Sequence, residues 1–103
     1  MINVYLVYIN YNIKMSEKRI NLIKESLNQL NPTEIEIIDQ GHLHVGHVGA
    51  KQGGHFDLYI SSKNFDGLNT LQRHQLIYEC LAELMKTEIH ALSIKRAASP
   101  NDN

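Results

Sequence analysis

The sequence has one cysteine, no apolar run of membrane length and almost no net charge, and each of these excludes a class of protein. Because Cys80 is the only cysteine, the chain can form neither an internal disulfide nor a metal site built from its own cysteines alone. A reducing compartment is the simpler expectation for such a chain, so we expect a cytoplasmic protein. No segment reaches the roughly 18 consecutive apolar residues that a membrane span needs, and we expect no association with a membrane.

The charges and polar side chains also argue against two common activities. The net charge is −1 with histidines neutral, so the chain offers no bulk attraction for a polyanion. The sequence shows no nucleophile paired with a base, no close pair of carboxylates and no phosphate-cradling motif. We therefore expect a protein that is not an enzyme and has no small-molecule substrate. Its 103 residues, 43% of them apolar and 20% charged, predict one globular domain.

Glycine and histidine are concentrated in residues 42–55, which we call the glycine–histidine segment. It holds four of the six histidines and four of the six glycines. Glycine has no side chain, so packing cannot hold such a segment in place. We interpret it as a loop that presents imidazole groups.

Two stretches have the apolar spacing of helices. In the first, Ser16 is the expected N-cap and Asn31-Pro32 ends the helix. For residues 1–14, a loosely ordered extension is favoured over a helix that displays a stripe of tyrosines. The apolar positions that define the two helices are Ile20, Ile23, Leu27 and Leu30 in the first, and Leu71, His74, Ile77 or Tyr78, Leu81 and Leu84 in the second.

The second helix opens with a capping box formed by Asn69 and Gln72, and it should end near Lys86. Strands are predicted around 34–37, 55–61 and 89–94, because apolar and polar residues alternate there. In the middle strand, the alternation directs Phe56, Leu58 and Ile60 toward the core.

This order of elements gathers histidines at one edge of the predicted sheet. A strand, a helix and a further strand form a right-handed crossover, which makes the second and third strands parallel. His90, at the start of the third strand, should therefore lie beside His44, His47 and His55. Imidazole nitrogen is a common metal ligand, so for His90 with His44 or His47 the pattern favours a metal site and a purely structural role about equally.

Other interpretations hold for the remaining candidates. A histidine outside a cluster is most often a partly exposed surface residue, which is the favoured interpretation of His42 and His55. His74 is expected to be a hydrogen-bonded core histidine. Arg73 and His74 lie near the positive end of their helix, where an anionic group of a partner could dock. A solvated Arg73 is nevertheless the favoured interpretation.

Several blocks of residues resemble the BolA family. They are Phe65-Asp66-Gly67, the run from Leu71 to Tyr78 with its Arg-His-x-x-x-Tyr pattern, Leu81-Ala82-Glu83 and the block Ile89-His90-Ala91-Leu92-Ser93-Ile94. The segment from Asp39 to Phe56, with its His-x-His-x-x-His-x-Gly-Ala sequence, is similar to BolA proteins of the alphaproteobacterial type. The resemblance covers residues 16–98 in order. It leads us to divide the chain into an N-terminal extension (1–14), a BolA-like domain (15–96) and a polar C-terminal tail (97–103).

The resemblance implies an α+β fold, a single α-β-β-α-β domain with a three-stranded mixed sheet and helices on one face, similar to the type II KH fold. It further implies pairing with a monothiol glutaredoxin and a shared [2Fe–2S] cluster, held on the other side by the glutaredoxin cysteine and glutathione. In that arrangement His90 is one ligand, and His44 or His47 is the second. We expect no cofactor in the isolated chain.

Relatives of this type are also described as transcriptional regulators, so DNA binding is the alternative function. The segment Gly46-His47-Val48-Gly49 has the Gly-x-x-Gly pattern of KH domains, but it lies between strands and not between helices. Lys95 and Arg96 form a local basic pair near the third strand and, with Arg73 and His74, are the candidate contacts for a partner or for nucleic acid.

Overall fold

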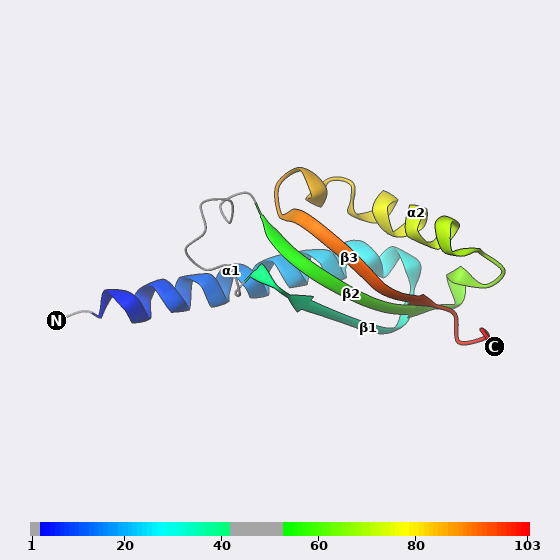
Figure 1. Ribbon diagram of the computed structural model, residues 1–103, viewed down its shortest axis with the longest axis horizontal. Helices are drawn as coiled ribbons and strands as arrows, with labels where there is room; N and C mark the ends of the chain where they lie inside the picture. Colours follow the sequence, from blue (N-terminus) through cyan, green and yellow to red (C-terminus); the bar gives the residue numbers. More distant parts are fainter. Residues whose placement is uncertain (1–2, 42–52) are drawn as a thin grey trace.

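The computed structural model describes residues 3–41 and 53–103, which contain two helices and three strands in the order α-β-β-α-β (Figure 1). The five elements are α1 (Val4–Leu27), β1 (Pro32–Asp39), β2 (Gly54–Ser62), α2 (Thr70–Leu81) and β3 (Ile89–Ala98). Short 3₁₀ turns lie between them at Asn28–Leu30, Lys63–Phe65 and Leu84–Lys86. The α+β fold that the sequence predicts is confirmed.

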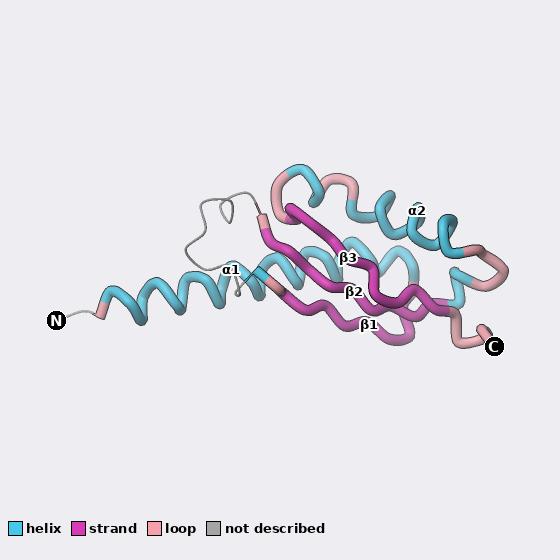
Figure 2. The backbone as a smooth tube through the Cα atoms, in the orientation of Figure 1, coloured by secondary structure: helices cyan, strands magenta, loops and turns pink. Residues whose placement is uncertain are grey.

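The strands form one mixed sheet in the order β1-β2-β3. β1 and β2 are antiparallel, whereas β2 and β3 are parallel, with Leu58 opposite Ile37 on one side and Ile94 on the other. In Figure 2 the chain leaves β2, passes through α2 and returns to the opposite end of the sheet to begin β3. The parallel pairing that was predicted from the crossover between the second and third strands is confirmed.

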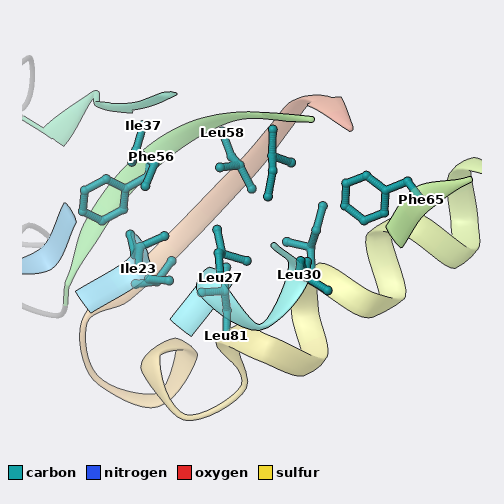
Figure 3. Close-up of a cluster of buried hydrophobic side chains, with 11 residues drawn as sticks. Ile23, Leu27, Leu30, Ile37, Phe56, Leu58, Phe65 and Leu81 are labelled. Atoms are coloured by element: carbon teal, nitrogen blue, oxygen red, sulfur yellow. The ribbon is translucent and has the colours of Figure 1, made fainter. Parts of the chain in front are cut away.

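The hydrophobic core lies between the sheet and both helices (Figure 3). Alternate residues of β2 point into it, as the sequence pattern predicts, and each buried side chain of this kind contributes about 1.5–3 kcal/mol to folding. The fully buried members are Phe56, Leu58 and Ile60 of β2, Ile23 and Leu27 of α1, Ile77 and Leu81 of α2, and Phe65 and Ile89.

The first helix is longer than the sequence predicts. It begins at Val4, where the side-chain oxygen of Asn3 accepts hydrogen bonds from the backbone N–H groups of Tyr5 (3.0 Å) and Leu6 (3.3 Å). The predicted start at Ser16, after a loosely ordered extension, is therefore wrong. Asparagine is as good an N-cap as serine, but β-branched and aromatic residues dominate the following turns and weaken the helical signal there.

The second helix begins where the sequence predicts, because both hydrogen bonds of the Asn69–Gln72 capping box are formed. It ends earlier, at Leu81, and the chain then makes a separate 3₁₀ turn up to Lys86. The placement of Leu71 on the buried stripe was wrong, since 67% of that residue is exposed. Of the two alternatives at the next turn, Ile77 is buried and Tyr78 is exposed.

Arg73 joins the start of α2 to the end of the chain. Its Nη1 and Nη2 atoms donate hydrogen bonds to the two carboxylate oxygens of Asp102 at 2.6 and 2.9 Å. The same guanidinium group donates to the carbonyl oxygens of Leu68 (2.9 Å) and Ala97 (3.0 Å). The prediction of a solvated Arg73 was wrong, because its side chain is only 13% exposed. The anion that compensates its charge comes from the chain itself.

A second set of hydrogen bonds ties the same segment to the turn before α2. The carboxylate of Asp66 accepts hydrogen bonds from the hydroxyl of Ser99 and from the side-chain amide of Asn101 (2.8 Å). Ser99 is buried, and β3 continues through Ala98, two residues into the segment predicted as a tail. We call the Arg73–Asp102 and Asp66–Ser99–Asn101 contacts the C-terminal clasp.

Leucines at two positions of α2 test which face of the helix carries the stability. The substitution Leu81→Ala should lower the free energy of unfolding by about 2–5 kcal/mol, because it leaves a cavity in the core. Leu71→Ala removes the same atoms from an exposed position and should change the free energy of unfolding by no more than about 0.5 kcal/mol. Urea unfolding measures both, and equal losses would contradict the assignment of faces.

The clasp should also make stability depend on pH. The hydrogen bond from Arg73, then that from the backbone N–H of Ser99, hold the pKa of Asp102 well below its ordinary value. The contribution of Asp102 is therefore complete above the unfolded pKa of about 3.9 and is lost as the pH falls toward the lower folded pKa. Asp102→Asn should lower the melting temperature at neutral pH. The difference in melting temperature between this variant and the wild type should shrink as the pH is lowered from about 5 to about 2.

A matched control is available in the exposed ion pair between Glu83 and Lys86 (3.0 Å). Exposed pairs of this kind contribute little, so Glu83→Gln should leave the melting temperature unchanged at every pH. If Asp102→Asn behaves like Glu83→Gln in thermal unfolding followed by circular dichroism, the clasp does not stabilise the fold.

Candidate metal centre

The starts of β2 and β3 lie side by side at one edge of the sheet. Gly54, the first residue of β2, pairs with Ile89, the first residue of β3. This follows from the crossover, since parallel strands begin at the same edge. His90 therefore lies at the edge where the glycine–histidine segment ends, as predicted from the order of elements.

An irregularity at the start of β3 brings two imidazole rings together at this edge. The register shifts after the Gly54–Ile89 pair, so that His55 lies opposite Ala91 and His90 is the extra residue. Bulges of this kind often redirect a side chain beside a functional site. The rings of His55 and His90 are stacked, with centroids 5.0 Å apart and planes inclined by 21°. His90 is exposed and His55 is half-buried, so the pair faces solvent.

Two glycines allow the backbone of β2 to approach β3 closely at this point. Gly53 has φ = +105°, and a Cβ atom there would lie 3.0 Å from the carbonyl of Glu88 and from the backbone nitrogen of His90. At Gly54, whose N–H donates to the carbonyl oxygen of Glu88 (3.0 Å), a Cβ atom would lie 2.6 Å from the ring of Phe56. Glycine at position 53 therefore lets the backbone approach the start of β3, and glycine at position 54 leaves room for the ring of Phe56.

An ion pair connects the same edge to α1. The side-chain nitrogen Nε of Arg19 lies 3.3 Å from a carboxylate oxygen of Glu88, and both side chains are largely buried. The Nζ atom of Lys18 lies 4.0 Å from the other oxygen of Glu88. Glu88, two positions before His90, is thus held to α1 by this ion pair and to Gly54 by a backbone hydrogen bond.

The predicted loop ligands His44 and His47, together with His42, lie outside the described residues. Within residues 3–41 and 53–103, no three histidine, cysteine, aspartate or glutamate side chains are grouped to hold a metal ion. The described part of this edge offers two imidazoles, those of His55 and His90. A metal site here needs further ligands from the glycine–histidine segment or from another molecule.

Cys80 is not one of these ligands. It is partly buried on α2, where it packs against the hydrophobic core. Burial, followed by the negative charge of Glu79, raises the pKa of its thiol. The thiolate is the form that binds metals, so Cys80 is suited to packing.

The other candidate contacts lie away from the histidine pair. The Arg73 guanidinium belongs to the clasp, and its pKa is raised by the hydrogen bond to Asp102. His74 is half-buried and borders a shallow hollow on α2 with Leu71 and Tyr78. Lys95 and Arg96 are exposed on β3, but Lys95 lies five positions along the strand from His90, roughly 16 Å away.

His55 is the residue that sequence reasoning undervalued. The predicted order of elements brings His55 to the same edge as His90, but isolated histidines are most often surface residues, which favoured a surface role for His55. The contact between the two rings depends on the register shift at the start of β3. That shift has no signature in the sequence, because the alternation of Ile89, His90 and Ala91 is compatible with regular pairing.

Comparison with known proteins places this geometry in a family. The family model described as "BolA-like protein" matches residues 27–101. Over 83 residues the chain is 41% identical to Protein BOLA1, chloroplastic, of Arabidopsis thaliana, a match that covers 76% of this chain and 52% of that protein. It is also 36% identical over 73 residues to the DNA-binding transcriptional regulator BolA of Escherichia coli (strain K12), covering 70% of this chain and 68% of that one.

Solved structures agree with the sequence comparisons. The structure of BolA1 from Arabidopsis thaliana matches with a TM-score of 0.68 and 35% sequence identity, and the match covers 82% of this chain and 95% of that one. The chain spans about half the length of the chloroplastic BOLA1 protein that it matches. The family model covers most of the present chain, from the end of α1 to the clasp, so the chain belongs to the BolA family.

Proposed function

We propose that this protein is a non-enzymatic adaptor that pairs with a monothiol glutaredoxin and supplies histidine ligands to a [2Fe–2S] cluster shared with that partner and with glutathione. The observation that carries the proposal is the stacked, solvent-facing pair of His55 and His90 at the edge of the sheet. Membership of the BolA family supports it, because the resemblance implies this partnership.

The donor atoms at the edge suit one half of such a cluster. Imidazole nitrogen is an established ligand of [2Fe–2S] centres, and two histidines on one iron raise the reduction potential relative to four cysteines. With metal–nitrogen bonds of about 2.1 Å, two imidazoles on one metal hold their donor atoms no more than about 4.2 Å apart. The centroid separation of 5.0 Å between the two rings is of the same order as this limit.

The remaining ligands must come from outside this chain. Cys80 is the only cysteine, and it packs against the core. A [2Fe–2S] cluster needs thiolates, which a glutaredoxin cysteine and glutathione would supply. Iron competes with protons for the imidazole nitrogen near pH 6.5. A cluster held by histidine should therefore be released more readily than one held by four thiolates. Such release favours a role in cluster transfer or iron sensing.

The second histidine ligand is drawn from three candidates. His44 and His47 are the candidates that the family resemblance implies, and His55 is the one in contact with His90. In each case His90 is shared, because it is the histidine that β3 contributes to this edge. A substitution series on the three residues separates them.

The test is to mix the full chain with a cluster-loaded monothiol glutaredoxin and glutathione, and to record visible absorption and circular dichroism. His90→Ala should change both spectra and speed the loss of the cluster, because one iron loses a protein ligand. His90→Cys should restore the cluster with a lower reduction potential, since thiolate replaces imidazole. Among His44→Ala, His47→Ala and His55→Ala, the variant that reproduces the His90→Ala spectrum identifies the second ligand.

His74→Ala is the matched control, since His74 lies on α2 away from the edge. It should leave the spectra of the complex unchanged. If His90→Ala also leaves them unchanged while the complex still forms, the histidine edge does not bind the cluster.

DNA binding is the second candidate function. The Escherichia coli relative is named a DNA-binding transcriptional regulator, and Lys95 and Arg96 are exposed on β3 of this chain. Phosphate contacts release counterions, so the logarithm of the binding constant should fall by about 0.9 per contact for each tenfold rise in salt. Replacing Lys95 and Arg96 together by glutamine should flatten this slope by about two units, measured by fluorescence anisotropy across a salt series. A slope near zero for the wild type would exclude phosphate-mediated binding.

A further inference from the structure

The first three turns of α1 form the most exposed apolar surface of the described chain. Residues 3–13, which we call the apolar arm, include no charged side chain; the first charge along the chain is at Lys14. The arm and the buried part of the same helix differ sharply, since Val4 is 77% exposed and Ile23 is 0% exposed. The exposed large apolar residues of the arm are Val4, Tyr5, Leu6, Val7, Tyr8, Tyr11 and Ile13.

The arm extends beyond the rest of the molecule. Figure 1 shows α1 continuing past the end of the sheet toward the N-terminus. The longest dimension of the molecule is 58 Å, whereas the other two are 22 and 20 Å. The sheet and α2 therefore leave most of the arm's surface uncovered.

The composition of the arm gives it little helical stability of its own. Isolated helices shorter than about 12–15 residues are marginal in water, and valine, isoleucine and tyrosine are weaker helix formers than alanine or leucine. The cap at Asn3 supplies two hydrogen bonds at the very start of the arm, which marks a defined helix start. Burial of the apolar side chains against a partner would add to the stability that the cap and the continuity with the buried part of α1 provide.

The exposed residues include one continuous stripe. Val4, Val7, Tyr8 and Tyr11 follow three- and four-residue spacing, which places them along one side of the helix. Leu6 and Ile13 lie roughly opposite, because each residue advances about 100° around the helix axis. The stripe has the spacing of a seam between two helices.

We propose that the arm packs against the arm of a second copy of this chain, as an antiparallel helix pair with two-fold symmetry. Two identical arms bring no like charges together, because neither carries a charged side chain. The four stripe residues expose roughly 500 Å² per copy, if an aromatic side chain offers ~150–250 Å². A pair would bury roughly 1,000 Å² in total, the lower limit for a specific interface, so the dimer should be weak.

A lipid surface fits the arm less well. The arm contains no lysine or arginine to attract anionic headgroups, and Lys14 is the first basic residue after it. Within residues 3–41 and 53–103, neither helix combines the length and apolar character that a bilayer crossing requires.

Sedimentation velocity of the full chain, from about 1 to about 300 μM, tests the proposal over the affinity range expected for a small interface. The wild type should pass from monomer to dimer within this range. Tyr11→Glu places a charge on the seam and should weaken association by about tenfold or more. Leu6→Glu adds the same charge on the side of the helix opposite the stripe, so the Leu6→Glu variant should still dimerise.

Urea unfolding of each variant serves as a check on the fold, and the free energy of unfolding of the monomer should match the wild type because both positions are exposed. A wild type that stays monomeric at the highest concentration would overturn the proposal. So would equal weakening by Leu6→Glu and Tyr11→Glu. Binding of the monomeric wild type to vesicles of phosphatidylcholine and phosphatidylglycerol would assign the arm to a membrane surface instead.

Discussion

The parallel pairing of β2 with β3 is the constraint on which the candidate site depends. A crossover through α2 obliges both strands to begin at the same edge of the sheet. Two histidines separated by 35 positions in the chain, His55 and His90, therefore become neighbours through the topology of the sheet. Their proximity follows from the topology and from the burial of Phe56, Leu58 and Ile60, which fixes the register of β2 in the sheet.

The close packing of backbone at this edge explains why glycine and histidine occur together. Gly53 and Gly54 let the chain pass against Glu88 and His90, where any side chain would collide with backbone or with Phe56. The Arg19–Glu88 ion pair then anchors the same point to α1. Rigid support therefore lies behind the imidazoles, while the rings themselves face solvent. This division suits ligands that must be accessible to a partner and yet held in a defined position.

Those parts of the fold that depend on local chemistry were predictable from sequence. The capping box of Asn69 and Gln72 starts α2 because a side chain and a backbone group three residues apart satisfy each other. The burial of alternate residues in β2 follows from the two-residue period of a strand. The predictions that were wrong concern residues whose surroundings come from distant parts of the chain. Arg73 lies in a helical pattern that does not reveal where the C-terminus runs, and Asp102 decides the environment of Arg73. The His55–His90 contact likewise required the register shift of β3, which three-dimensional packing determines.

The start of α1 was predicted wrongly for a different reason, and its true position bears on how the molecule meets its partners. The sequence of the apolar arm is a poor helix former, so only the observed cap and the continuity with Ile23 and Leu27 place it in the helix. Arg19 of α1 contacts Glu88 beside the histidine edge, so the helix passes this edge on its way to the arm. From Arg19 back to Val4, the helix extends by roughly 22 Å. The apolar arm and the histidine pair therefore belong to the same end of the molecule, which Figure 1 also shows for the starts of β2 and β3. The two proposals therefore concern neighbouring surfaces of one elongated chain.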